Sequence, residues 1–173
     1  MTFQLVGNGP QIYEEVMDHL WFGRWASALV DMLALRDSER VLDVACGTDV
    51  TTGIAKQKVG ASMTIIGLDI NAPMLAKAKE LADDPDIGWL ESDVWDSGLT
   101  AETCDVILSK RGYHYFPDKP GTLNEFYRLL TPGGRMGFAV WHGHSAYTHA
   151  LCVAVKRHIS PEAALTKANS ISQ

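Results

Sequence analysis

A glycine-containing turn and a later aspartate have the residue types and spacing of a nucleoside-binding site. The apolar run Val41-Leu42-Asp43-Val44-Ala45 leads into Cys46-Gly47-Thr48, and a glycine in such a turn lets a ligand approach the backbone. Asp69 ends the next apolar run, 22 residues after Gly47, where a carboxylate can accept hydrogen bonds from both ribose hydroxyls. A dinucleotide turn needs three glycines spaced G-x-G-x-x-G, and only Gly47 lies in this turn, so an adenosyl ligand without a pyrophosphate fits better.

Alternating strands and helices must position these residues. Short apolar runs predict five strands, at residues 41–45, 63–68, 87–90, 105–108 and 135–141. Helical patterns lie between them. This alternation predicts a doubly wound, mainly parallel Rossmann-like α/β sheet with helices on both faces. Ligands of such sheets bind beyond the carboxyl ends of the strands, which is where Gly47 and Asp69 fall.

The helix starts carry capping signals. Asn8 is placed to cap a first helix that contains Pro10 in its first turn, and its apolar stripe continues as far as Leu33. Asn71 is placed to cap the helix after Asp69. Thr122 and Glu125 match a capping box for a helix that runs through Leu130, and residues 145–158 have the pattern of a last helix.

Length and composition fit a single domain. The 173 residues are 46% hydrophobic and 21% charged, enough for a folded core. We expect an N-terminal helical segment at 1–36, a cofactor-binding core at 37–141 and a C-terminal helix and tail at 142–173. The formal net charge is −6, whereas a nucleic-acid partner would require a basic surface, so none is expected.

No targeting, membrane or metal signal is found. No apolar run approaches the roughly 18 residues of a membrane span, and no signal-peptide pattern is present, so we expect a cytoplasmic protein with no membrane partner. The three widely spaced cysteines are predicted to be buried thiols in a reducing compartment: Cys46, Cys104 and Cys152. A histidine cluster has no acidic or thiol partner nearby, so no metal site is predicted: His142, His144 and His149.

The sequence at 41–48, Val-Leu-Asp-Val-Ala-Cys-Gly-Thr, resembles motif I of the class I S-adenosylmethionine (SAM)-dependent methyltransferases. Further matches follow in the family's order, at 67–75, 92–94, 104–107, 116–118 and 130–135. The series is similar to the small-molecule branch that includes the quinone-biosynthesis C-methyltransferases. The resemblance implies an enzyme that transfers a methyl group from SAM to a small-molecule acceptor, with secondary metabolism as one setting and S-adenosylhomocysteine as the product.

The resemblance also implies roles for single residues. Asp43 and Gly47 would face the methionine moiety and Asp69 the ribose, and Ala45 in the same turn would also contact the cofactor. The adenine would contact four residues: Ile70, Met74, Asp93 and Val94. Tyr13 would close over the cofactor, although aromatic residues in such a position more often pack in the core than line a pocket. His114 follows the fourth strand, where it is either the catalytic base or a loop histidine, and Asp43 is either a ligand contact or a hydrogen-bond partner of the turn.

Two features depart from the family pattern. Asp49 stands where motif I usually has its second glycine. Aspartate tolerates positive φ. As a cofactor-binding residue, Asp49 would place a carboxylate about 4 Å from that of the cofactor, at a cost on the order of 1 to 4 kcal/mol. An attraction to the ammonium or sulfonium of the cofactor is the alternative that would offset this cost. The chain also lacks the sequence for the family's last two strands, which would leave the strand at 135–141 as an open apolar edge. A second copy of the chain is expected to cover that edge as a homodimer.

These departures keep two other functions open. One is a methyltransferase-fold protein that no longer methylates and instead catalyses a cyclisation, isomerisation or elimination. The other is a non-catalytic subunit that supplies its open edge to a longer partner. Replacing Asp49 by glycine distinguishes a working methyltransferase from a chain that no longer methylates. A large gain in cofactor affinity in this variant would favour the chain that no longer methylates.

Overall fold

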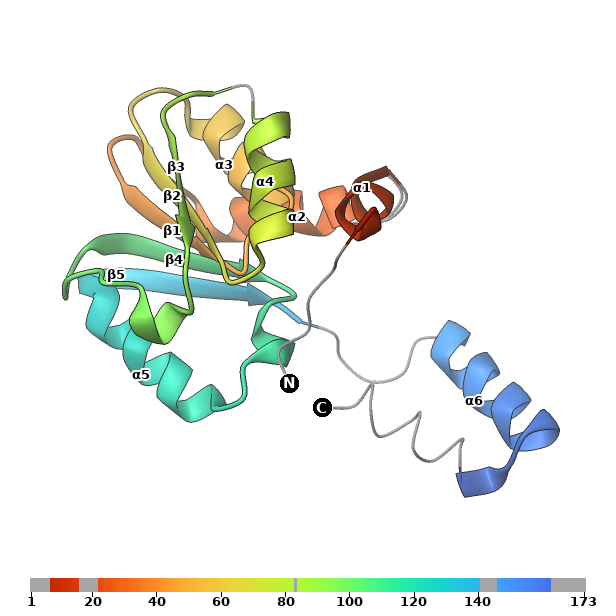
Figure 1. Ribbon diagram of the computed structural model, residues 1–173. Coiled ribbons are helices and arrows are strands. Elements are labelled where there is room, and N and C mark those ends of the chain that lie inside the picture. Colours follow the sequence, from red (N-terminus) through yellow and green to blue (C-terminus); the bar gives the residue numbers. More distant parts are fainter. Residues whose placement is uncertain (1–6, 16–21, 83, 141–145, 163–173) are drawn as a thin grey trace. The chain divides into compact units, whose positions relative to one another are not determined.

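The computed structural model describes residues 7–15, 22–82, 84–140 and 146–162 (Figure 1). Statements about the structure concern these residues. The chain forms two compact units, one at 1–139 and one at 140–173, and each is described by itself. The first unit contains the sheet and the N-terminal helices, and the second contains helix α6.

The first unit is built on five parallel strands. They are β1 (Arg40–Val44), β2 (Thr64–Asp69), β3 (Ile87–Glu91), β4 (Cys104–Lys110) and β5 (Leu130–Ala139). Their order in the sheet is β3-β2-β1-β4-β5, and every neighbouring pair is parallel. The order reverses between β1 and β4, which creates a crevice at the carboxyl ends of these two strands. The predicted doubly wound parallel sheet is therefore confirmed.

Helices cover both faces of this sheet (Figure 1). One face packs against α2 (Gly23–Leu33) and α3 (Val50–Val59), whose Val30 and Ala55 belong to one apolar core with Val41 and Leu108. The other packs against α5 (Lys119–Leu129) through Phe126. Alternate residues of each strand point to opposite faces, so a single strand supplies both cores. Helix α4 (Ala72–Leu81) follows β2 and contacts β2 and β3.

The capping predictions have different outcomes. Asn71 caps α4, and its side chain accepts a hydrogen bond from the Met74 N–H at 3.3 Å, as expected. The Thr122–Glu125 capping box is wrong. The cap of helix α5 lies four residues earlier, at Asp118, which accepts from the Gly121 N–H at 3.0 Å. Thr122 lies inside the helix, where its hydroxyl donates to the Asp118 carbonyl at 2.7 Å.

The strand boundaries also shift. Strand β5 begins at Leu130, which pairs with Cys104, rather than at Arg135. The register then shifts before Arg135 pairs with Val106, so the Pro132-Gly133-Gly134 stretch forms an irregular part of the strand. Strand β4 continues two residues beyond its predicted end, to Lys110, and this extension brings Lys110 to the crevice. The predicted strand end at Trp141 lies outside the described residues.

The N-terminal helix is shorter than its apolar stripe suggests. Helix α1 covers Gly9–Ile12, with Pro10 in its first turn as predicted and Asn8 at the cap position without a side-chain hydrogen bond. The stripe positions at 16–21 lie outside the described residues. No helix in the described ranges is long and apolar enough to cross a membrane.

The second unit contains α6 (Ala146–His158), which corresponds to the predicted last helix; Ser145 lies outside the described residues. Cys152 on this helix is partly exposed, so the prediction of three buried thiols is wrong for this residue, whereas Cys46 and Cys104 are buried. In the part of the chain that the structure describes, no three potential ligand side chains gather around a common point where a metal could bind. His142 and His144 fall outside it.

Candidate functional site

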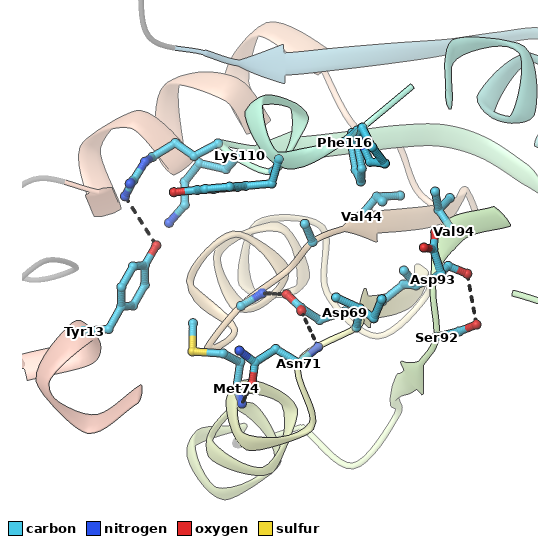
Figure 2. A pocket seen from close by; sticks show the side chains of 18 residues that line it. Tyr13, Val44, Asp69, Asn71, Met74, Ser92, Asp93, Val94, Lys110 and Phe116 are labelled. Atoms are coloured by element: carbon cyan, nitrogen blue, oxygen red, sulfur yellow. Dashed lines mark hydrogen bonds between the residues drawn. The ribbon is translucent and has the colours of Figure 1, made fainter. Parts of the chain in front are cut away.

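An open cavity lies at the carboxyl ends of β1, β2 and β4, at the crevice where the strand order reverses (Figure 2). Of the eleven residues predicted for the site, eight line this cavity: Tyr13, Ala45, Gly47, Asp69, Ile70, Met74, Asp93 and Val94. The other three, Asp43, Asp49 and His114, do not belong to this lining. Because the lining comes from the ends of separate strands, the sheet itself brings these residues together.

The turn between β1 and α3 forms the floor of the cavity. Three of its residues have positive φ: Ala45 at 58°, Gly47 at 65° and Asp49 at 92°. The Cys46 N–H donates to the Leu68 carbonyl at 3.1 Å, which ties the turn to the end of β2. A positive φ is costly for a residue with a Cβ, so alanine and aspartate here store strain at the cavity.

Asp69 joins this turn to the start of α4. Its Oδ2 accepts from the Gly47 N–H at 2.9 Å and its Oδ1 from the Asn71 N–H at 2.8 Å (Figure 2). The side chain is 8% exposed, and burial raises its pKa while these hydrogen bonds oppose the rise. A carboxylate offers about four lone-pair sites, so each oxygen can accept a further hydroxyl. Asp69 therefore has both the structural role of a turn partner and the capacity to bind a diol.

Apolar side chains form the walls beside Asp69. Met74 on α4 lies on one side, and Val94 and Phe116 lie across the cavity from it (Figure 2). Ile70 also belongs to the lining. Asp93 stands at the end near Val94, where its carboxylate accepts from the Trp95 N–H at 3.1 Å and caps a short 3-10 turn, Val94–Asp96. Two apolar walls with a carboxylate at the end suit a flat ring that carries an amino group.

The N-terminal segment reaches the cavity from the opposite end. Glu14 accepts a hydrogen bond from the Thr48 hydroxyl at 2.6 Å, which fixes this segment to the β1–α3 turn. The Tyr13 ring lies 5.6 Å from the Phe22 ring, centroid to centroid, and its hydroxyl accepts from Arg111 Nη1 at 3.5 Å. Tyr13 thus both packs and lines the cavity, so the two interpretations of this residue hold together.

Two cations in the lining were not predicted. Lys110 ends β4 and is 7% exposed, and Arg111 follows it with φ at 66°. Phe22 lies beneath both, with its ring centroid 5.4 Å from Lys110 Nζ and 3.9 Å from Arg111 Cζ. The signal that could have revealed them is a pair of basic residues at the end of an apolar strand, because that end faces the ligand side of the sheet.

Asp43 lies beneath the cavity rather than in its lining. It is fully buried, and its Oδ2 accepts from the Thr52 hydroxyl of α3 at 2.7 Å, while its Oδ1 has no hydrogen-bond partner among the described residues. Burial raises its pKa to about 7, opposed by the Thr52 hydrogen bond and the Lys110 charge. Asp43 therefore holds the turn against α3.

Asp49 and His114 also lie outside the cavity lining. Asp49 lines a second cavity beside Lys56 and Asp84, and its Oδ2 lies 3.0 Å from the position that a Cβ on Gly53 would take. His114 lies in the 3-10 turn Tyr113–Tyr115, partly buried. Its pKa is lowered by burial and by the nearby charges of Arg111 and Lys119.

A doubly wound sheet with a cavity at the reversal of its strand order is the architecture of nucleotide-binding α/β domains. Comparison with known proteins narrows this class. Residues 42–138 match a family described as "Methyltransferase domain", which covers more than half of the chain. The chain therefore belongs to the class I SAM-dependent methyltransferase family.

Individual relatives agree with this assignment. The chain is 35% identical, over 72% of its length and 57% of the relative's, to a 2-phytyl-1,4-naphtoquinone methyltransferase of Thermosynechococcus vestitus. It is 32% identical to a ubiquinone/menaquinone biosynthesis C-methyltransferase UbiE of Methylococcus capsulatus, over 65% of this chain and 47% of the relative. The chain thus spans about half the length of these curated relatives.

Solved structures show the same fold. An S-adenosylmethionine-dependent methyltransferase from Mesorhizobium loti superimposes with a TM-score of 0.61 at 27% identity, covering 69% of this chain and 53% of the other.

Proposed function

We propose that the chain binds SAM in the cavity at the ends of β1, β2 and β4 and catalyses methyl transfer to a small-molecule acceptor. The observation that carries the proposal is the position of Asp69. Its carboxylate is buried beside the Gly47 turn, faces the cavity and keeps lone pairs for a diol. When bound, the cofactor supplies a methyl group activated by a sulfonium.

The lining residues fit the parts of this cofactor. Asp69 would hold the ribose, with Gly47 and Ala45 of the turn beside it. The walls at Ile70, Met74 and Val94 would hold the adenine, and Asp93 at their end would accept from its amino group. Asp43 would act from below by fixing the turn through Thr52. Tyr13 would close the cavity from the N-terminal side.

We infer that acceptor positioning, rather than a strong acid or base, supplies most of the rate. Tyr115 and Pro117, in the segment after β4, belong to the cavity lining and form the surface against which an acceptor would rest. His114 precedes them and stays our candidate for the base, because its lowered pKa keeps the imidazole neutral and able to accept a proton at pH 7. A His114→Gln variant should lose the acid limb of the pH–rate profile if His114 is the base.

The names of the relatives support a small aromatic acceptor. Two are named as a 2-phytyl-1,4-naphtoquinone methyltransferase and a C-methyltransferase of ubiquinone/menaquinone biosynthesis, and a third relative, 31% identical, is the nocamycin O-methyltransferase of Saccharothrix syringae. We propose an apolar or phenolic acceptor of this kind. The position of Asp49 supports methyl transfer over the alternative of a chain that no longer methylates, since its carboxylate lines a different cavity and lies against Gly53.

Titration calorimetry with S-adenosylhomocysteine tests the cofactor site. Loss of the Asp69 charge removes charge-assisted hydrogen bonds to the ribose, so Asp69→Asn should weaken binding by about 100-fold. Asp86→Asn makes the same chemical change at an exposed position and should bind like the unmodified chain. No binding by the unmodified chain at millimolar ligand would overturn the proposed function.

We also propose a cytoplasmic homodimer in which the expected single domain of 1–173 pairs through β5. The support is that β5 ends the strand order of the described sheet, and that Cys46 and Cys104 are free thiols, as is usual in a reducing compartment. Mass measurement in solution tests the dimer. A stable monomer with an intact fold would contradict it.

A further inference from the structure

Two adjacent cationic side chains stand on the wall of the cavity. Lys110 is the last residue of β4 and Arg111 follows it, and both belong to the lining. Only 7% of Lys110 is exposed. Burial of a charged group is costly unless opposite charge or polar groups compensate. A ligand that brings negative charge would gain from a cation that is already partly desolvated.

The surroundings hold these two cations in place. The Phe22 ring lies under both, and at 3.9 Å the Arg111 guanidinium is in close cation–π contact with it. Arg111 Nη1 donates to the Tyr13 hydroxyl at 3.5 Å. Asp43 lies within electrostatic range of Lys110 but is fully buried under the cavity floor. Lys110 thus interacts with a carboxyl beneath the floor and also belongs to the lining of the cavity.

The cations and the acids occupy different parts of the cavity. In Figure 2, Lys110 and Tyr13 lie toward one end, Asp93 and Val94 toward the other, and Asp69 lies between them. With the ribose at Asp69 and the adenine at Val94, the end at Lys110 is where the amino-acid part of the cofactor and the acceptor would meet. A cation there can contact either molecule.

We propose that Lys110 and Arg111 form an anion subsite, which binds a carboxylate or an ionised hydroxyl of a ligand in the cavity. The inference rests on the proposed function, because that function fixes the orientation of the cofactor. The anionic oxygen has two sources: the amino-acid carboxylate of the cofactor, or an acidic group on the acceptor. Both are recognised by the same chemistry, a charge-assisted hydrogen bond to an ammonium or guanidinium.

The first experiment compares two nucleosides by titration calorimetry. S-Adenosylhomocysteine carries the amino-acid carboxylate, and 5′-methylthioadenosine lacks the whole amino-acid part. If the cofactor is the source, Lys110→Met should weaken binding of S-adenosylhomocysteine by about 10- to 100-fold and leave 5′-methylthioadenosine unchanged. Lys79→Met, on the exposed face of α4, removes the same charge away from the cavity and should change neither.

The second experiment uses the protein saturated with S-adenosylhomocysteine. It compares 4-hydroxybenzoate, an acidic phenol, with the uncharged 4-hydroxybenzyl alcohol. If the acceptor is the source, the unmodified chain should prefer the acid, and Lys110→Met should abolish that preference without changing the affinity for either nucleoside. Either pattern supports the anion subsite, and the two patterns tell its sources apart.

The inference is overturned if Lys110→Met and Lys79→Met behave alike toward all four compounds. In that case the proposed function still stands, provided that the unmodified chain binds S-adenosylhomocysteine. A chain that binds neither nucleoside overturns the proposed function, and the inference falls with it. Circular dichroism and the thermal midpoint check folding, and Arg111→Met replaces Lys110→Met, with the same outcomes, if the latter does not fold.

Discussion

The pKa values of the carboxyl groups shift in opposite directions at the two ends of the sheet. At the amino end, Arg40 donates to both carboxylate oxygens of Asp105, at 2.9 and 3.0 Å, and Thr131 donates to Asp105 as well. These contacts hold the pKa of Asp105 well below its usual range. At the carboxyl end, burial raises the pKa of Asp43 to about 7 and also raises that of Asp69.

The two ends also differ in how completely their polar side chains are hydrogen-bonded. Among the described residues, buried oxygens without a hydrogen-bond partner include Asp43 Oδ1, Thr51 Oγ1 and Ser109 Oγ, which belong to the carboxyl end of β1 and β4 and the start of α3. At the amino end, Arg135 donates to both oxygens of Glu39, at 2.7 and 2.9 Å. The amino end is therefore built for stability, whereas the carboxyl end accepts electrostatic cost at the place where a ligand would bind.

The largest effect is expected from filling the space at Gly112, where the chain leaving β4 passes the β1–α3 turn. A Cβ on Gly112 would lie 2.4 Å from the Ala45 Cβ and 3.2 Å from the Val44 carbonyl oxygen. Gly112→Ala should therefore destabilise the fold by about 3 kcal/mol through overpacking and weaken S-adenosylhomocysteine binding at least about tenfold, because the turn must shift. Urea unfolding and calorimetry measure the two effects.

Gly98→Ala is the matched control for Gly112→Ala. Gly98 has a φ of 68°, and a Cβ there would meet nothing within 4 Å beyond its chain neighbours, so alanine costs only backbone strain of about 1 kcal/mol. Ligand affinity should stay the same. Equal losses of stability and affinity in the two variants would mean that the close approach at Gly112 does not position the turn.

The second prediction concerns the amino end. Asp105→Asn removes the charge from the hydrogen bonds with Arg40 and Thr131 and should lower stability at pH 7 by about 1 to 2 kcal/mol, with no change in ligand affinity. Because the folded pKa of Asp105 is depressed, its stabilisation is present above its ordinary pKa and is lost as the pH falls below it. The difference in stability between the variant and the unmodified chain should therefore narrow steadily as the pH falls from about 4 toward 2.

Urea midpoints between pH 2 and 8 measure this convergence. A change in S-adenosylhomocysteine affinity in Asp105→Asn would contradict the conclusion that the amino end of the sheet contributes to stability and not to ligand binding.

Much of the fold could be predicted because buried strands have a continuous apolar pattern. The same pattern located Gly47 and Asp69, since the carboxyl ends of parallel strands meet at one edge. Lys110 and Arg111 were missed because basic residues at the end of a strand are typical of solvent-exposed ends. The start of α5 was misplaced because Thr122 and Glu125 match a capping box, although Asp118 makes the hydrogen bond.

The direction of the Asp49 side chain could not be predicted from its own position. It depends on space at Gly53, four residues later in the first turns of α3, and no local pattern couples the two residues.

The third prediction uses the raised pKa of Asp43 at the carboxyl end. A carboxyl whose pKa is higher in the folded state binds its proton more tightly there than in the unfolded chain. The contribution of Asp43 to stability therefore falls as the pH rises from about 4 to about 7 and is constant above that range. Asp43→Asn should remove this fall, and urea midpoints at pH 4 to 8 measure it.

Thr52→Val provides a contrasting variant for Asp43. The Thr52 hydroxyl donates to Asp43 Oδ2 and thereby lowers the pKa of Asp43. Its removal should raise that pKa further, so the fall in stability should extend to higher pH. An unchanged pH dependence in Asp43→Asn would show that Asp43 is not the group responsible.

The smallest effect is expected from Asp49→Gly. A carboxylate facing the cofactor's own carboxylate would weaken binding by one to three decades, from about 1 to 4 kcal/mol of repulsion. In the structure, Asp49 lines a different cavity and lies against Gly53. Asp49→Gly should therefore change S-adenosylhomocysteine affinity by less than about threefold. It should slightly stabilise the fold, because glycine adopts the φ of 92° at this position without backbone strain.

Gly53→Ala tests the same arrangement from the other side. Its new Cβ would lie 3.0 Å from Asp49 Oδ2 and push the carboxylate away from α3, so this variant should bind the ligand less tightly than the unmodified chain. In the Asp49→Gly background the same substitution should have no effect on affinity, because no carboxylate remains to be displaced. A gain of tenfold or more in Asp49→Gly alone would place the charge in the binding cavity and favour a chain that has stopped methylating.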